Sequence, residues 1–278
     1  MGLSDLLAKK SSIQVCCCPQ DLSNLNKFIL SEYPNLASSI RNTCFGGLLD
    51  VHLGPLSVYV CLHIIDKWNS VSKHFVSGNG TVIPILVEDV KSMYSLTSKG
   101  DSLFKVEWKK IDISGAKELC KKYGIALDGR CKSSAIGESI LKALKENADL
   151  LRRPKEYCIL YAYYSLFRVL VPTSGTTITL KWLVKLMEPN LGVKYNWSEA
   201  VHERLVNSLS HTKDKYSAPS SWNYLRPAGD LHFLMVSFYI IIIYFYIYLF
   251  NCFLICVFFS IFSIFYISSL GRFQRLAI

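Results

Sequence analysis

The strongest constraint on this chain is a long apolar run near its C-terminus. From Ser237 to Ile267, 31 residues include no charged residue and no Gly, Ala or Pro, and 22 of them are Phe, Ile or Tyr. About 20 apolar residues suffice for a helix to cross a bilayer. The run therefore predicts a transmembrane-like segment over residues 233–269, with Phe233–Ile267 in the lipid bilayer and a short basic tail at 270–278. On this interpretation the chain is a membrane protein with a C-terminal single-pass anchor.

The same run has a second interpretation, because its composition is unusual for a membrane span. Natural spans use Gly, Ala, Leu and Val freely, whereas residues with A- and T-rich codons predominate here. Val236 and Ser237 can be encoded by GTAAGT, which is a consensus intron donor. A competing hypothesis is that Val236 onward is translated intron. The chain would then be truncated, and the nucleus would be favoured over the membrane.

The rest of the chain is moderately basic and contains scattered thiols. Residues 233–278 contribute two basic residues and no acidic ones, so residues 1–232 hold 29 Lys and Arg against 21 Asp and Glu. This balance suits a nuclear setting or an anionic surface and establishes neither. The ten cysteines form no regular framework, and Met1–Lys10 lacks the apolar stretch of a secretory signal. Free thiols in a reducing compartment are therefore expected.

Hydrophobic periodicity predicts a mainly α-helical fold with one small β-hairpin, plus the C-terminal hydrophobic segment. Apolar residues recur at helical spacing over Ser57–Trp68, Ala135–Leu151 and Tyr157–Val171, and the last is apolar nearly all round, as in a central core helix. Short β-prone runs flank Ser77–Gly80, and Pro84 would confine its strand to a sheet edge. The predicted boundaries are 1–24 for a flexible lead-in, 25–210 for the helical domain and 211–232 for a polar linker.

Two local signals predict where helices begin. In "YNWSEAVHERLVNSL", Asn196 can cap a helix and Glu199, three residues on, can reach back to it, as in a capping box. In "VEDVKSMYSL", acidic residues stand at the start of a short predicted helix that puts Val87, Val90 and Tyr94 on one side.

The sequence predicts no catalytic residue, no cofactor site and no metal site. Gly124–Ser133 imitates the start of a phosphate-binding loop, but Arg130 and Cys131 stand where Lys and Ser or Thr would grip phosphate and magnesium. His202 and Glu203 lack the second histidine, one turn further on, that a zinc protease helix requires. We therefore expect a protein that is not an enzyme.

One basic stretch is a candidate surface for an anionic partner. Its lysines alternate with aromatic residues, an arrangement that can meet phosphates and stack on bases. Acidic residues dilute the stretch, so nucleic-acid binding is only weakly supported and a solvated helix face is the simpler interpretation. The candidate residues are Lys105, Trp108, Lys109, Lys110, Lys117, Lys121 and Lys122, and the diluting acids are Glu107, Asp112 and Glu118.

Two sequence blocks carry a resemblance to a known family. The first starts with an Arg-x-x-x-Phe-Gly-x-Leu-Leu pattern at Arg41–Leu49 and continues through a Trp-containing segment to Ile83–Val90. The second holds a Leu-x-Pro-Thr-Ser run at Leu170–Ser174 and a Tyr-Asn-Trp-Ser-Glu run at Tyr195–Glu199. Together, from Leu25 to Met235, they resemble the plant-specific aminotransferase-like, or plant mobile, domain, whose relatives occur upstream of SUMO-protease-like domains. The chain departs from that pattern at "MYSLTSKGD", where a Gly-Leu-Pro-type turn is usual.

The resemblance implies a binding role more than a chemical one. Such domains are associated with transposable elements and nuclear proteins, and no catalytic residues are established for them. A pyridoxal-phosphate enzyme would need a Schiff-base lysine and a phosphate cradle, and the sequence nominates neither. The expectation is a non-enzymatic interaction module of transposon-related origin with an unknown protein partner. The alternative is a fragment of a SUMO-protease-like cysteine peptidase that lacks its catalytic domain.

Overall fold

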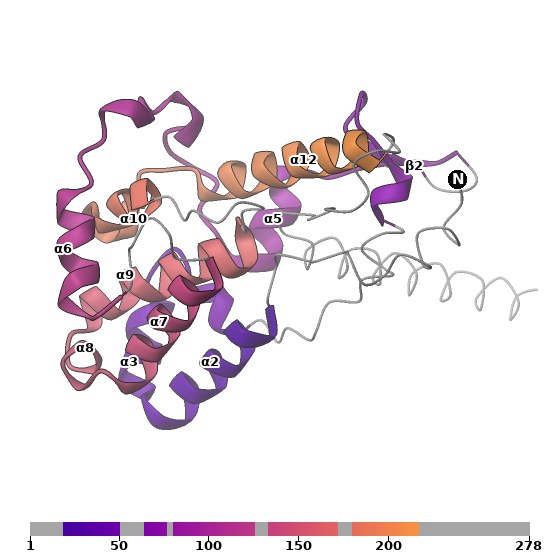
Figure 1. The fold of residues 1–278 in the computed structure, drawn as a ribbon. Helices are drawn as coiled ribbons and strands as arrows, with labels where there is room; N and C mark the ends of the chain where they lie inside the picture. The colour runs from indigo at the N-terminus through magenta and orange to yellow at the C-terminus, as the bar shows by residue number, and fades with distance from the viewer. Residues whose placement is uncertain (1–18, 51–63, 77–79, 126–132, 172–179, 217–278) are drawn as a thin grey trace, which may run out of the picture. The chain divides into compact units, whose positions relative to one another are not determined.

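The computed structural model describes residues 19–50, 64–76, 80–125, 133–171 and 180–216, which are mainly helical (Figure 1). The α-helices are α2 (Pro19–Glu32), α3 (Pro34–Arg41), α5 (Val87–Tyr94), α6 (Ser114–Lys122), α7 (Ser133–Glu146), α8 (Ala148–Leu151), α9 (Pro154–Ser165), α10 (Leu180–Met187), α11 (Pro189–Gly192) and α12 (Trp197–Tyr216). Short 3₁₀ turns are η2 (Gly46–Asp50), η3 (Leu103–Lys105) and η4 (Trp108–Lys110), and a π-helical turn is η5 (Leu166–Leu170). The strands are β1 (Trp68–Asn69), β2 (His74–Val76) and β3 (Val82–Pro84).

Helix α9 lies at the centre of the helical core, as its all-round apolar sequence predicts. Every residue from Tyr157 to Ser165 is buried, and the helix packs against α3, α7, α8 and α10. Its tyrosines place hydroxyl groups in this core, where a buried polar atom is usually hydrogen-bonded. The Tyr163 hydroxyl is an exception, with no hydrogen-bond partner among the described residues. The Tyr161 hydroxyl donates to Asn26 Oδ1 (2.9 Å), and Asn26 Nδ2 donates to the Leu48 carbonyl (2.7 Å). This buried chain of hydrogen bonds ties α9 to α2 and η2.

The predicted hairpin is confirmed, and it is part of a larger sheet. β2 and β3 pair antiparallel with Phe75 opposite Ile83, and Pro84 lies on the edge strand as expected. A third strand, β1, pairs antiparallel with β2. The prediction that the helix continues to Trp68 is therefore wrong. The Trp68 ring packs edge-on against Phe75 (centroids 4.9 Å apart), and its Nε1 donates to Ser210 Oγ (3.1 Å) on α12, which the periodicity could not reveal.

Helix boundaries differ from the predicted ones at several places. α2 begins at Pro19, ahead of the predicted start at Leu25, and α12 continues to Tyr216, inside the predicted linker. The single helix predicted over Ala135–Leu151 is two helices, because the Asn147 side chain accepts a hydrogen bond from the Leu150 N–H (3.0 Å) and caps α8. The apolar residues keep their helical spacing on both sides of Asn147, so the periodicity alone does not reveal that one helix ends and another begins there.

The predicted C-terminal membrane anchor requires a correction. Within the ranges given above, no helix combines the length and the apolar character needed to cross a bilayer. The longest described helix, α12, has 20 residues but carries charged side chains along its length, including Glu199, Glu203 and Arg204. Residues 233–267 themselves lie outside the described residues. The predicted single-pass anchor and the membrane localisation are therefore overturned by the residues that the structure describes.

Candidate functional site

The predicted basic residues lie on one continuous segment of the chain, from η3 through η4 to α6. We call residues 103–122 the lysine segment. All six of its candidate lysines are exposed. Lys117 and Lys121 are four residues apart on α6 and therefore share one side of that helix. Trp108 is half-buried, and its indole packs on Trp182 of α10, with ring centroids 5.4 Å apart. The lysines are therefore exposed to solvent, whereas Trp108, the residue predicted to stack on bases, already packs on Trp182.

Two of these lysines are already paired with carboxylates. Lys110 Nζ lies 2.5 Å from Glu107 Oε2, and Lys122 Nζ lies 2.6 Å from Glu156 Oε2. The Tyr123 hydroxyl also donates to Glu156. Burial alone would raise the pKa of Glu156, but the hydrogen bonds from Lys122 and Tyr123 lower it below its usual value.

The remaining four lysines have no ion-pair partner among the residues whose positions are described. They are Lys105, Lys109, Lys117 and Lys121. Lys117 does interact with Asp112, because hydrogen bonds from Ser114 and, to a smaller extent, the charge of Lys117 lower the pKa of that carboxyl. An exposed, unpaired ammonium attracts an anionic partner without first having to break an internal salt bridge.

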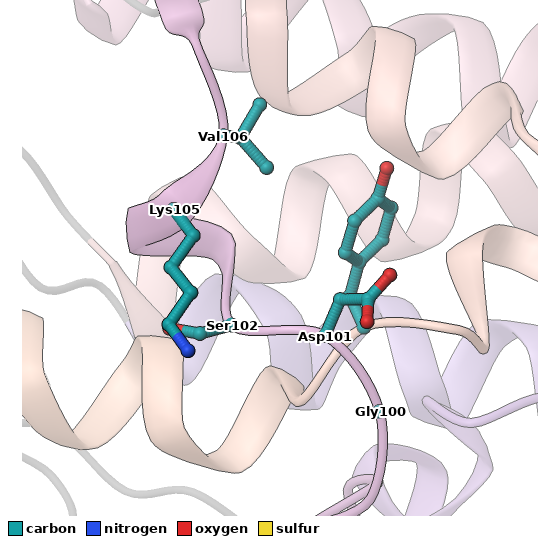
Figure 2. A pocket seen from close by; sticks show the side chains of 6 residues that line it. Gly100, Asp101, Ser102, Lys105 and Val106 are labelled. Carbon is teal, nitrogen blue, oxygen red and sulfur yellow. The ribbon is translucent and has the colours of Figure 1, made fainter.

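A polar pocket of about 360 Å³ opens at the start of the lysine segment (Figure 2). Its lining residues are Gly100, Asp101, Ser102, Lys105, Val106 and Tyr195. The two chain stretches that form it are joined by backbone hydrogen bonds. The Asp101 N–H donates to the Lys194 carbonyl (2.7 Å), and the Asn196 N–H donates to the Asp101 carbonyl (3.0 Å). Asp101 and Tyr195 therefore form a parallel bridge, which fixes the pocket walls against each other.

This bridge also corrects one half of the predicted capping box. Asn196 Oδ1 accepts from the Glu199 N–H (3.0 Å), so Asn196 caps α12 as predicted. The Asn196 N–H, however, donates to the Asp101 carbonyl rather than to Glu199. Further bonds support the junction, because Thr97 Oγ1 donates to the Tyr195 carbonyl (2.9 Å).

Behind the pocket, Tyr195 belongs to a partly buried charge cluster. Its hydroxyl donates to Glu188 Oε1 (2.9 Å) and accepts from Lys185 Nζ (2.9 Å), and Lys194 Nζ lies 2.6 Å from Glu188 Oε2. The two ammonium groups lie 5.2 Å (Lys185) and 5.0 Å (Lys194) from the centroid of the Tyr195 ring, within cation–π range. Burial would raise the pKa of Glu188, but hydrogen bonds from Lys194, Lys185 and Tyr195 lower it overall. The cluster holds the phenol ring in one orientation.

The short segment α11, which is a left-handed turn rather than a regular α-helix, delivers Tyr195 to this position. Asn190, Leu191 and Gly192 all have positive φ angles, of 53°, 55° and 62°. This conformation is strained for a bulky residue such as Leu191. The turn is held by Trp197, whose Nε1 donates to the Gly192 carbonyl (3.1 Å) in a buried position. The aromatic ring of Trp197 packs in turn against Phe45 and Trp182.

Other chemically interesting groups have structural roles where they are described. Burial raises the pKa of the Cys44, Cys120 and Cys158 thiols to about 12, so these are poor nucleophiles at neutral pH. His202 Nε2 is hydrogen-bonded to the Ile85 carbonyl (2.8 Å). Of Gly124–Ser133, the segment whose start resembles a phosphate-binding loop, residues 126–132 lie outside the described residues.

Sequence reasoning found Lys105 but missed its pocket neighbours. Asp101, Ser102 and Tyr195 come together only through a bridge between distant parts of the chain, and single-sequence periodicity carries no information on such pairings. One weak signal was present. The bridge joins "MYSLTSKGD", where the chain departs from the plant mobile domain pattern, to the Tyr-Asn-Trp-Ser-Glu run, which follows that pattern.

The fold and pocket define a helical domain with a small antiparallel sheet and a polar cavity to which Lys105 contributes. Residues 15–235 match the family model described as Domain of unknown function (DUF8566), and the chain belongs to this family. No curated protein matches the chain, and no solved structure does. These comparisons do not bear on the resemblance to the plant mobile, aminotransferase-like domain, which stays a prediction.

Proposed function

We propose that this chain is a non-enzymatic interaction module that binds an anionic macromolecular partner through its lysine segment. The observation that carries the proposal is the set of four exposed lysines without ion-pair partners among the described residues. They occur within a short stretch of chain, so a partner that contacts one can contact the others. Interspersed positive charges of this kind steer association and contribute modestly to affinity.

The described cysteine thiols and His202 are held by the fold, which is consistent with a binding role. The buried thiols have raised pKa values, and His202 is bonded to the Ile85 carbonyl. The resemblance to the plant mobile domain supports the same role, since that family has no established catalytic residues. A transposon-related origin is part of this proposal and follows from the resemblance alone.

Binding of a generic polyanion tests the proposal. Fluorescence anisotropy of labelled heparin would be measured with the full chain, with a Lys117→Gln/Lys121→Gln variant, and with a Lys27→Gln/Lys91→Gln control. The control removes the same net charge from exposed positions on α2 and α5. We expect the first variant to weaken binding about 5- to 10-fold at about 0.05 M salt, with a smaller difference at about 0.2 M.

The control separates a local site from a general effect of net charge. It should stay within about twofold of the unmodified chain, because a distant exposed charge is largely screened. Equal weakening in the two variants, or no heparin binding by the unmodified chain, would refute the proposed function.

A further inference from the structure

We infer that the pocket beside Tyr195 binds a carboxylate side chain from an acidic polypeptide partner. This inference rests on the proposed function and names both the partner class and its point of attachment. Lys105 provides the link, because it belongs to the lysine segment and also lines the pocket (Figure 2). A polypeptide lying along the lysine segment can therefore insert one of its side chains into the cavity.

The pocket supplies two hydrogen-bond donors suited to a carboxylate. Lys105 and Ser102 both line it, and for neither side chain is a hydrogen bond or ion pair found among the described residues. A carboxylate accepts from both kinds of donor, and the bond to an ammonium is charge-assisted. The cavity, at about 360 Å³, is also of a size that takes up a side chain or a small ligand.

Asp101, a further polar residue of the pocket lining, limits the negative charge that a bound group can carry. Asp101 is exposed, lines the same cavity and has no ion-pair partner among the described residues. A phosphate monoester carries nearly two negative charges at neutral pH, whereas a carboxylate carries one. The single charge of a carboxylate is balanced by Lys105, whereas the second charge of a phosphate monoester would face Asp101 without a further cation in the lining. The pocket therefore favours a carboxylate.

The lysine segment itself favours a polypeptide over a nucleic acid. The Trp108 indole, which would be needed to stack on a base, packs on Trp182. The exposed carboxylates Glu107, Asp112 and Glu118 alternate with the lysines. A phosphodiester backbone repeats its negative charge at every nucleotide and would meet these acids, whereas a polypeptide can place neutral or basic residues opposite them.

The wall formed by Tyr195 is already ordered before a ligand arrives. Only 3% of Tyr195 is exposed, its hydroxyl is bound to Glu188, and its backbone is bridged to Asp101. A pocket whose walls are fixed loses little conformational entropy on binding.

Peptide binding by the full chain tests the inference. The probes are a fluorescein-labelled peptide of alternating glutamate and glycine, the same peptide with phosphoserine in place of glutamate, and a single-stranded oligonucleotide of equal charge. We expect the glutamate peptide to bind most tightly. Lys105→Gln should weaken it about tenfold, and the exposed-lysine control Lys27→Gln should leave it unchanged. Asp101→Asn should strengthen phosphoserine-peptide binding about 3- to 10-fold and change glutamate-peptide binding less.

The outcomes separate this inference from the proposed function. If Lys105→Gln has no effect while Lys117→Gln/Lys121→Gln weakens binding, the proposed function stands and the pocket inference falls. If the oligonucleotide binds more tightly than the glutamate peptide, the partner is a nucleic acid and the inference falls. If heparin and all three probes fail to bind, both fall. Matching far-UV circular dichroism of the variants would show that each has kept its fold.

Discussion

Replacing Gly100 by alanine should destabilise the protein more than a positive φ angle alone can explain. Gly100 has φ of +117°, a region that residues with a side chain rarely adopt. A Cβ atom added there would lie 2.1 Å from the Lys194 carbonyl oxygen and 2.6 Å from its carbon. Both atoms belong to backbone that is bridged to Asp101, so neither can move aside without breaking the junction.

The expected loss has two parts. Backbone strain of this kind costs about 1 to 3 kcal/mol. Displacing the Lys194 carbonyl also disrupts its hydrogen bond from the Asp101 N–H, at about 1 kcal/mol. The free energy of unfolding should therefore fall by about 2 to 4 kcal/mol, out of a total that is typically about 5 to 15 kcal/mol.

Gly124→Ala provides a matched control. Gly124 also has positive φ (68°), but a Cβ there would meet nothing within 4 Å. Its alanine variant should lose only the left-handed strain, about 1 to 2 kcal/mol. Urea unfolding followed by tryptophan fluorescence and circular dichroism would compare the two. Equal midpoints for the two variants would refute the steric argument and place the effect in φ alone.

Two further predictions concern buried hydrogen bonds and pH. Tyr161→Phe removes the donor to the buried Asn26 Oδ1 and should lower the free energy of unfolding by about 1 to 3 kcal/mol in urea titrations. A loss no larger than that of a Tyr33→Phe control, at a half-buried tyrosine, would contradict this. The pKa of Glu188 in the folded protein lies below its usual 4.5. Ionised Glu188 therefore stabilises the fold fully above pH 4.5, and this stabilisation is lost as the pH falls through the lower folded-state pKa. Between about pH 7 and about pH 3 the unmodified chain should therefore lose more stability than Glu188→Gln, and equal losses would exclude a role for this group.

Local sequence patterns predicted the features that depend on neighbours in the chain. Helix α9 was predicted from its continuous apolar sequence, and the Asn196 cap from a polar residue at the start of a helical pattern. Pro84 was placed correctly on an edge strand because it has no N–H to donate to a second neighbour. In each case the physical cause lies within a few residues of the predicted feature.

The missed features depend on distant contacts. Trp68 is in a strand because its ring meets Phe75 and its indole N–H meets Ser210, which is 142 residues away. The pocket requires the pairing of Asp101 with Tyr195, and the Thr97–Tyr195 hydrogen bond spans 98 residues. The lysines of the candidate surface could be read from the sequence, but the engagement of Trp108 with Trp182 could not.

Helix α12 connects the two ends of this arrangement. Its N-cap residue, Asn196, donates its N–H to the Asp101 carbonyl at the pocket. Near the other end of α12, Ser210 and Lys213 bind Trp68 and Asp66 beside the small sheet (Figure 1). A helix of 20 residues is about 30 Å long and resists bending. The Asp101–Tyr195 junction and the base of the small sheet are therefore held at opposite ends of one helix, so α12 sets the distance between them.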